Sequence, residues 1–226
     1  MDTNKTQVYN LIILDKSGSM ESIRQEAING YNETIGSIKA AQLKHADSQE
    51  HFISLAAFCS CGVDMIYDCV PINEAEKLTK EKYNPCCCTP LYDAIGSTVK
   101  ALGKKSDEIE DTAVLVTIIT DGEENASKEW NGPAVKALIE ERKEEGWVFS
   151  YIGADHDVEK AATSISITNI VSWSKSIAGT MAVINNENSA RSRFYDKIDE
   201  SCNKAGVTVA HKKNLRKQLA KDYYKK

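Results

Sequence analysis

The sequence predicts an α/β fold with a doubly wound, mostly parallel sheet, one antiparallel edge strand and helices on both faces. Two mostly apolar runs, at 8–14 and 113–120, have the composition of buried strands. A segment with helical spacing of apolar residues comes after each run, and such alternation is typical of α/β folds. Two shorter strand-like runs lie close together in the chain and add the antiparallel strand.

The first third of the chain contains one strand–helix unit and then a hairpin. The strand at 8–14 precedes a helix at about 20–45, whose apolar residues recur at helical spacing. Strands at 51–58 and 63–70 are separated by only a few residues, including Gly62, which indicates a hairpin. Because a hairpin pairs its strands in opposite directions, we expect a mixed sheet.

The rest of the chain continues the alternation of strand and helix. Thr89 followed by Pro90 is a favourable helix start, because threonine caps free backbone N–H groups and proline suits the first turn. The elements expected after the hairpin are a short helical piece near 73–78, a helix from 89, a strand at 113–120, a helix at 133–145, a strand at 148–153, a helical turn at 158–163, a weaker strand at 168–172 and a helix at 176–204. We expect residues 6–204 to form one domain and residues 205–226 to form a basic helical extension.

Composition narrows the class of partner. With 226 residues and 42% apolar side chains, the chain is long enough for one well-buried core. A net charge of -5 gives no reason to expect nucleic acid or an anionic membrane surface. No apolar run approaches the roughly 20 residues of a membrane span, and the N-terminus is polar. We therefore expect a protein or small-molecule partner and no membrane association.

Cysteine usage predicts the compartment. The count of seven is odd, and residues 86–88 are three consecutive cysteines, which suits reduced thiols better than a bridged framework. A cytoplasmic location follows. Cys59-x-Cys61 together with residues 86–88 also raises the question of zinc, but the spacing lacks the paired pattern of a structural zinc site, so free thiols are favoured.

Oxygen-bearing side chains come directly after the first strand. Asp15, Ser17 and Ser19 lie where the backbone must turn sharply, and Gly18 relieves the steric cost of that turn. Taken alone, this segment is equally well a helix-capping turn, because Asp and Ser side chains bind the free N–H groups at helix starts.

Two more segments bring oxygen ligands to the same edge of the sheet. Asp121 ends the second buried strand, and Thr89 begins a helix that must return to the sheet. In an open α/β sheet, ligands bind outside the carboxyl ends of the strands, where the strand order reverses. We therefore expect Asp15 and Asp121 to face each other there.

These segments together strongly resemble the von Willebrand factor A (vWA) domain family over about residues 6–204. All five positions of that family's metal-ion-dependent adhesion site are present in order and at compatible spacing. The resemblance implies an intracellular, bacterial-type, stand-alone member that binds a partner and does not catalyse a reaction. It further implies a divalent cation, Mg²⁺ first with Mn²⁺ or Ca²⁺ also open, held directly or through water by Asp15, Ser17, Ser19, Thr89 and Asp121.

The chemistry of this donor set agrees with the resemblance. Hard cations prefer oxygen ligands, and Mg²⁺ keeps several waters that an incoming ligand can replace. Only two of the five residues are acidic, so the ion should stay electrophilic and accept an Asp or Glu carboxylate from a partner protein. The family resemblance also leaves open that Thr89 switches between direct and water-mediated contact.

Three alternative functions would use parts of the same sequence pattern. The first is a regulatory or assembly subunit that docks on an AAA+ ATPase-type machine, as some intracellular members of the family do. The second is a Mg²⁺-dependent phosphohydrolase with Asp15 as nucleophile, but such enzymes need a second acid two residues later, where Ser17 stands. The third is acyl transfer by Ser17, which lacks the Gly-x-Ser-x-Gly turn and a positioned histidine.

Several remaining polar residues have a structural and a functional interpretation. Glu123 and Glu124 form either an acidic rim or a solvated loop, and the loop is favoured. The segment 155–157, Asp-His-Asp, either lines the binding surface or caps a helix. The other histidines, His45, His51 and His211, are scattered and are interpreted as surface or capping residues. The basic tail is interpreted as a solvated helical face, with an acidic protein patch or nucleic acid as alternative partners.

Overall fold

The computed structural model describes residues 5–154, 157–173, 176–202 and 207–225. Six strands form one sheet in the order β3-β2-β1-β4-β5-β6. The β2–β3 pair is antiparallel and the other pairs are parallel, which confirms the predicted mixed sheet. The strands are β1 (Thr6–Asp15), β2 (Gln49–Cys59), β3 (Gly62–Pro71), β4 (Thr112–Thr120), β5 (Val148–Gly153) and β6 (Asn169–Ser172).

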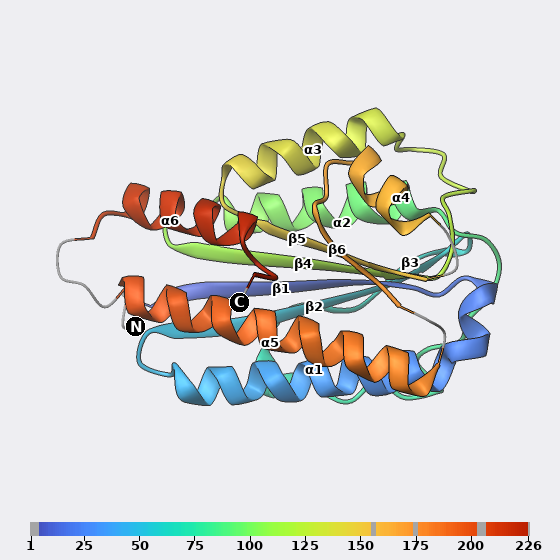
Figure 1. Ribbon diagram of the computed structural model, residues 1–226, viewed down its shortest axis with the longest axis horizontal. Coiled ribbons are helices and arrows are strands. Elements are labelled where there is room, and N and C mark those ends of the chain that lie inside the picture. Colours follow the sequence, from blue (N-terminus) through green and yellow to red (C-terminus); the bar gives the residue numbers. More distant parts are fainter. Residues whose placement is uncertain (1–4, 155–156, 174–175, 203–206, 226) are drawn as a thin grey trace.

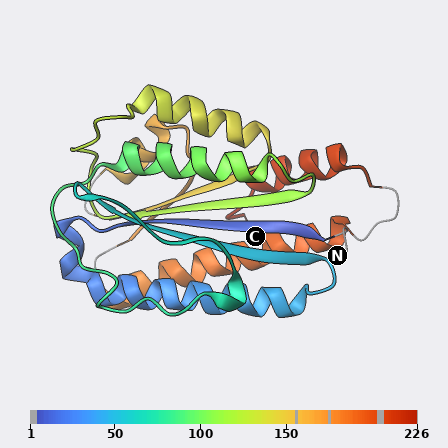
Figure 2. The same ribbon diagram turned by 180° about the vertical axis from the view of Figure 1, so that it is seen from behind.

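Helices cover both faces of this sheet, as predicted. Figure 1 shows α1 and α5 on one face and α2, α3 and α4 on the other, and the reverse view in Figure 2 shows the same three layers. The helical elements are the 3-10 helices η1 (Gly18–Ile23) and η2 (Ile72–Glu74), and the α-helices α1 (Arg24–Lys44), α2 (Leu91–Ser106), α3 (Gly132–Glu144), α4 (Val158–Ser164), α5 (Ile177–Cys202) and α6 (Val209–Lys221).

Alternation along the central strand divides the core between the two faces. Leu11 and Ile13 of β1 pack in the cluster that includes α2 and α3. Ile12 and Leu14 pack in the cluster that includes α1. Successive strand residues point to opposite faces, so the apolar residues of one strand supply both layers.

Three predicted helices differ from the structure in extent. The helix expected to open at Thr89 begins only at Leu91, and Pro90 is its N-cap residue. The helix expected at about 20–45 begins as η1, and α1 starts only at Arg24. The piece expected near 73–78 is limited to η2, and the chain beyond it runs over α1 without regular structure. Asn32 of α1 explains this path, because its side-chain amide donates to the Leu78 carbonyl at 3.1 Å and its oxygen accepts from the Leu78 N–H at 2.8 Å.

Helix α6 lies against α5, β5 and α3, at the end of the sheet where β1 and β4 begin (Figure 1). Tyr223, just beyond α6, is buried against Phe194 of α5 and Val148 of β5. The Arg216 guanidinium donates to Asp111 at 2.5 Å and to the Thr112 carbonyl at 2.6 Å. The basic tail therefore joins the same packed body as the sheet.

Candidate metal centre

Asp15 is the last residue of β1, and its side chain is fully buried. One carboxylate oxygen, Oδ1, accepts from the Ser17 N–H at 2.6 Å, and Oδ2 accepts from the Thr120 hydroxyl at 2.6 Å. The Tyr83 hydroxyl donates to the Asp15 carbonyl at 2.5 Å. These three bonds fix both the backbone and the carboxylate of Asp15 where β1 ends.

The turn after β1 brings two serine hydroxyls beside the second carboxylate. Ser17 Oγ lies 3.2 Å from Ser19 Oγ, and the Ser19 hydroxyl donates to Asp121 Oδ1 at 2.6 Å. The loop before α2 holds this turn in place, because the Gly18 N–H donates to the Cys87 carbonyl at 3.0 Å. Asp15, the two serines and Asp121 therefore meet at the carboxyl ends of β1 and β4.

Thr89 reaches the same place from the loop before α2. A Cβ built on Gly122 would lie 3.1 Å from Thr89 Oγ1 and 3.9 Å from Asp15 Oδ2, so the threonine hydroxyl and the carboxylate flank this glycine. The Asn125 side chain accepts from the Thr89 N–H at 2.9 Å, and the Asn125 N–H donates to the Thr89 carbonyl at 3.1 Å. This reciprocal pair holds Thr89 against the loop that follows β4.

The electrostatics of this cluster favour a cation. Burial raises the pKa of Asp15 to about 6, and the nearby Asp121 carboxylate adds to the increase, although hydrogen bonds from Thr120 and Ser17 oppose it. Two buried carboxylates and three hydroxyls face one another, and all five donors are oxygen. Hard divalent cations prefer this donor set. The residues present therefore fit a divalent cation of the Mg²⁺ class.

Three positioning residues had no predicted role. Thr120 directly precedes Asp121, and Asn125 lies in the loop that follows it. Their positions next to a predicted ligand could have indicated a supporting role. Tyr83 had no signal, because its contact with Asp15 depends on the irregular chain between β3 and α2.

The structure separates the two glutamates after Asp121. Glu124 organises its own loop, since its carboxylate accepts from the N–H groups of Ala126 and Ser127 and from Tyr92 N–H at the start of α2, each within 2.8 Å. Glu123 is exposed. Beside the site, a hollow of about 330 Å³ is lined by both glutamates and by Lys160 of α4.

The remaining candidates lie in structural positions. Within the segment 155–157, Asp157 caps α4 by accepting from the Lys160 N–H at 3.0 Å, and its two neighbours lie outside the described residues. His45 is the C-cap residue of α1, and its Nε2 lies 2.9 Å from Asp196 Oδ1. The interpretation of His51 as a surface or capping residue was wrong, because His51 is fully buried within β2, with its Nε2 3.1 Å from Gln49 Oε1. His211 is exposed on α6.

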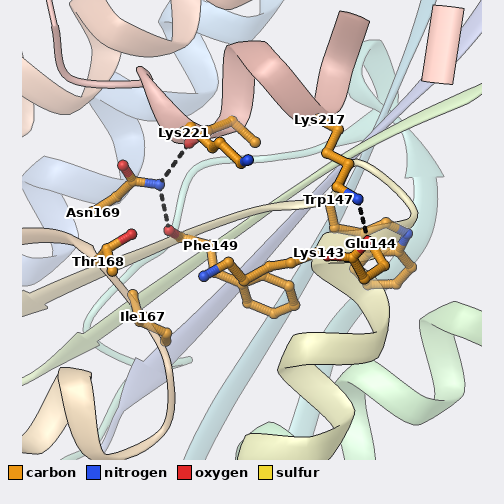
Figure 3. A pocket seen from close by; sticks show the side chains of 10 residues that line it. Lys143, Glu144, Trp147, Phe149, Ile167, Thr168, Asn169, Lys217 and Lys221 are labelled. Carbon is orange, nitrogen blue, oxygen red and sulfur yellow. Dashed lines mark hydrogen bonds and ion pairs between the residues drawn. The ribbon is translucent and has the colours of Figure 1, made fainter. Parts of the chain in front are cut away.

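A second cavity, of about 270 Å³, lies between α6 and the edge of β5 (Figure 3). Its aromatic floor is Trp147 and Phe149, which lie near the start of β5 and not at its carboxyl end. Two of its lysines already have partners, because Lys217 pairs with Glu144 and Lys143 donates to the Ser166 carbonyl at 2.8 Å. This cavity is separate from the oxygen cluster.

Comparison with known proteins shows the fold. No family model and no curated protein matches this chain. Among solved structures, the pilus adhesin SpaC from Lactobacillus rhamnosus GG matches with 14% identity and a TM-score of 0.64, over 85% of this chain and 31% of that chain. A mutant of the PilB minor pilin from Streptococcus sanguinis matches with 10% identity and a TM-score of 0.60, over 85% of this chain and 63% of that chain.

A third match is the manganese-loaded TRAP protein of Plasmodium vivax, with 14% identity and a TM-score of 0.51, over 75% of this chain and 68% of that chain. The chain thus spans only part of the length of the two pilus proteins. Identities this low carry information on the fold alone, and they show that this chain shares its α/β fold with these proteins. Across the described residues, no helix is long and apolar enough to span a bilayer.

Proposed function

We propose that this chain is a metal-dependent protein-binding module. In this proposal, Asp15, Ser17, Ser19, Thr89 and Asp121 hold a Mg²⁺-class cation directly or through water, and an Asp or Glu carboxylate of a partner protein completes its coordination. The observation that carries the proposal is the convergence of five oxygen-bearing side chains from three separate segments on one site, where hydrogen bonds already orient them.

The charge of the site supports a carboxylate as the incoming ligand. The carboxylates of Asp15 and Asp121 can at most neutralise the charge of a divalent cation, and the three hydroxyls contribute no negative charge. Neutral ligands and exchangeable waters leave the ion able to accept another anionic oxygen. The manganese-loaded TRAP structure supports the general class of cation, and the preference for Mg²⁺ rests on the donor chemistry.

We also propose that the site does not catalyse a reaction. A phosphohydrolase would need an acid at position 17, where a serine lies beside Ser19. Of the three described histidines, His45 pairs with Asp196, His51 lies at the opposite end of β2 and His211 is exposed on α6, so these positions do not provide Ser17 with a base. A cytoplasmic location is part of the proposal and is supported by the free thiols of the described cysteines.

Direct metal binding provides the first test. Mn²⁺ titrated into the full chain and followed by electron paramagnetic resonance should bind one site. Ser17→Ala and Asp121→Asn should each weaken binding more than the roughly 10-fold that loss of an outer-shell partner costs. Ser97→Ala is the matched control, because Ser97 is an exposed serine of α2 whose hydroxyl donates to the Asp93 carbonyl. Equal Mn²⁺ affinity in all four proteins would contradict the site.

Partner binding provides the second test. Affinity capture from native extract should recover a protein in Mg²⁺ and lose it in chelator, and Ser17→Ala should abolish recovery in Mg²⁺. Substituting acidic residues of the recovered protein should then identify the carboxylate. Capture that persists in chelator rules out the metal bridge, and phosphatase turnover abolished by Asp15→Asn replaces the binding function with an enzymatic one.

A further inference from the structure

Four cysteine thiols gather beside the oxygen cluster, from two segments that lie far apart in the sequence. Cys59 ends β2, Cys61 lies in the β2–β3 turn, and Cys86 and Cys87 lie in the loop before α2. Cys59 Sγ is 3.4 Å from Cys86 Sγ, and Cys61 Sγ is 3.4 Å from Cys87 Sγ. The sulfurs of Cys59, Cys61 and Cys86 all lie within 4.8 Å of one another.

Backbone hydrogen bonds hold the two segments together. The Ser60 N–H donates to the Cys88 carbonyl at 3.1 Å, and the Cys88 N–H donates to the Ser60 hydroxyl at 3.2 Å. Cys87 has a φ of 62°, a left-handed conformation that glycine or asparagine adopts more readily than cysteine. The loop thus holds a thiol at a position where the backbone alone would favour another residue.

From this arrangement we propose a second metal site, in which Cys59, Cys61, Cys86 and Cys87 bind a thiophilic cation of the Zn²⁺ class. Tetrahedral coordination with Zn–S bonds of about 2.3 Å places sulfurs about 3.8 Å apart. The sulfurs of Cys59, Cys61 and Cys86 are compatible with that spacing, and Cys87 adds a fourth sulfur 3.4 Å from Cys61. A disulfide would require about 2.05 Å, so these sulfurs are reduced thiols. On binding, each coordinating thiol releases its proton to solvent.

Donor chemistry separates this site from the oxygen cluster. Thiolates select zinc-like cations, whereas carboxylates and hydroxyls select Mg²⁺-like cations. Lys16, in the turn that carries Asp15 and Ser17, places its ammonium 2.7 Å from Asp64 Oδ2. The two sites therefore select different cations.

The thiol site also touches the backbone that carries the oxygen ligands. The Cys86 N–H donates to the Lys16 carbonyl at 2.8 Å, and the Gly18 N–H donates to the Cys87 carbonyl at 3.0 Å. Thr89 follows two residues after Cys87. A cation bound to the thiols would fix the loop that positions Ser17 and Thr89. The thiol site would then stabilise the arrangement of the oxygen ligands.

Titration of the reduced, chelator-treated full chain with Cd²⁺ tests the proposal, because Cd²⁺–thiolate bonds give a near-ultraviolet charge-transfer band. One equivalent should produce the band, and Zn²⁺ should compete for it. Cys61→Ser and Cys86→Ser should each weaken binding by more than roughly 10- to 100-fold, the cost of losing an outer-shell partner. Cys69→Ser, a half-buried thiol on β3, and Cys88→Ser, an exposed thiol in the same loop, should leave the titration unchanged.

The same experiment distinguishes the two metal sites. Asp15→Asn should keep the Cd²⁺ band while losing Mn²⁺ binding, and Cys61→Ser should keep one Mn²⁺ site. Absence of the band in the reduced protein, equal Cd²⁺ affinity in Cys61→Ser, or formation of Cys59–Cys86 and Cys61–Cys87 disulfides in place of metal uptake would each overturn the thiolate site. None of these outcomes affects the test of the oxygen site.

Discussion

At the scale of single residues, the buried Asp15 carboxylate costs stability until a cation compensates it. Its pKa of about 6 lies above the ordinary value of 3.8, so the folded state holds this proton more tightly than the unfolded state does. A carboxyl group with a raised folded pKa contributes stability below its unfolded pKa and loses that contribution as the pH rises through about 6. At neutral pH without metal, the ionised group therefore destabilises the fold.

Asp15→Asn should consequently stabilise the metal-free protein. At pH 7 in chelator, we expect a gain of roughly 2 to 3 kcal/mol in the free energy of unfolding, which is the pKa difference converted to energy. Chemical denaturation in chelator measures the gain, and Asp47→Asn, an exposed carboxyl group, serves as control. Added Mg²⁺ should stabilise the wild type and not Asp15→Asn. A less stable Asp15→Asn protein in chelator would contradict the electrostatic account.

Gly122 provides a second test at this scale, because its missing side chain makes room for Thr89. The added Cβ of Gly122→Ala would lie 3.1 Å from the Thr89 hydroxyl oxygen, which is closer than most such contacts, so the threonine must shift. We expect Mn²⁺ affinity to fall about 10-fold or more, because a displaced ligand loses alignment with the ion. Titration of Mn²⁺ measures this loss.

Gly36→Ala is the matched control for that substitution. Gly36 lies in α1, and a Cβ there meets nothing within 4 Å. The helix should gain about 0.5 to 1 kcal/mol from the alanine, while Mn²⁺ affinity stays unchanged. If both glycine variants bind Mn²⁺ like the wild type, the close approach of Thr89 does not matter for the site.

Residue by residue, the oxygen cluster was more predictable than the thiol cluster. Asp15 and Asp121 end buried parallel strands, and the carboxyl ends of such strands meet at one edge wherever the strand order reverses. Cys61 and Cys87 meet only because the hairpin turn and the loop before α2 pack against each other, and neither segment has a periodic pattern. Sequence spacing therefore argued against a zinc site that the fold makes geometrically feasible.

At the scale of elements, α6 anchors the start of the sheet. Arg216 is buried, and its guanidinium bonds Asp111 and the Thr112 carbonyl at the start of β4. Tyr223 donates to Glu187, whose carboxylate also pairs with the buried Arg191 at 2.9 Å. Removing residues 206–226 would break these contacts, so surface substitutions test the role of the tail more cleanly than truncation does.

Arg216→Ala should destabilise the protein by about 1 to 3 kcal/mol, because it leaves the partly buried Thr112 carbonyl without this donor and removes the packing of the arginine side chain. Urea denaturation measures the loss. Lys225→Ala is the control, since the Lys225 ammonium forms an exposed ion pair with Asp222, and it should not change the midpoint. Unchanged stability in Arg216→Ala would mean that α6 does not stabilise the start of the sheet through this residue.

Elements with a clear hydrophobic pattern could be predicted from the sequence. Long apolar runs such as β1 and β4, and the short connection of the β2–β3 hairpin, determined the sheet in advance. The segment after η2 was predicted as a helix and instead runs irregularly, because Asn32 binds both backbone groups of Leu78. A single tertiary contact there outweighs weak local propensity.

At the scale of the whole molecule, the two ends of the sheet respond to acid in opposite ways. Asp15 at the carboxyl end gains relative stability as the pH falls through about 6. His51 lies seven β2 residues before the end that pairs with Asp15, and burial lowers its pKa from 6.5 to about 3, with His45 and Arg191 adding to the decrease. A histidine with a depressed folded pKa loses stability as the pH falls below about 6.5, because the unfolded chain takes up the proton first.

Comparison of His51→Gln with the wild type isolates the second contribution, because the Asp15 contribution cancels between two proteins that share it. Between about pH 7.5 and about pH 5, His51 should cost the wild type about 2 kcal/mol of unfolding free energy that the glutamine variant does not lose. Denaturation at both pH values gives the change of unfolding free energy with pH for each protein. Comparing these two changes removes any constant destabilisation that the substitution itself causes. His211→Gln, at an exposed histidine, should keep the wild-type slope. Parallel slopes for His51→Gln and the wild type would mean that His51 takes up its proton in the folded state, and that this end of the sheet is more open to water than its packing indicates.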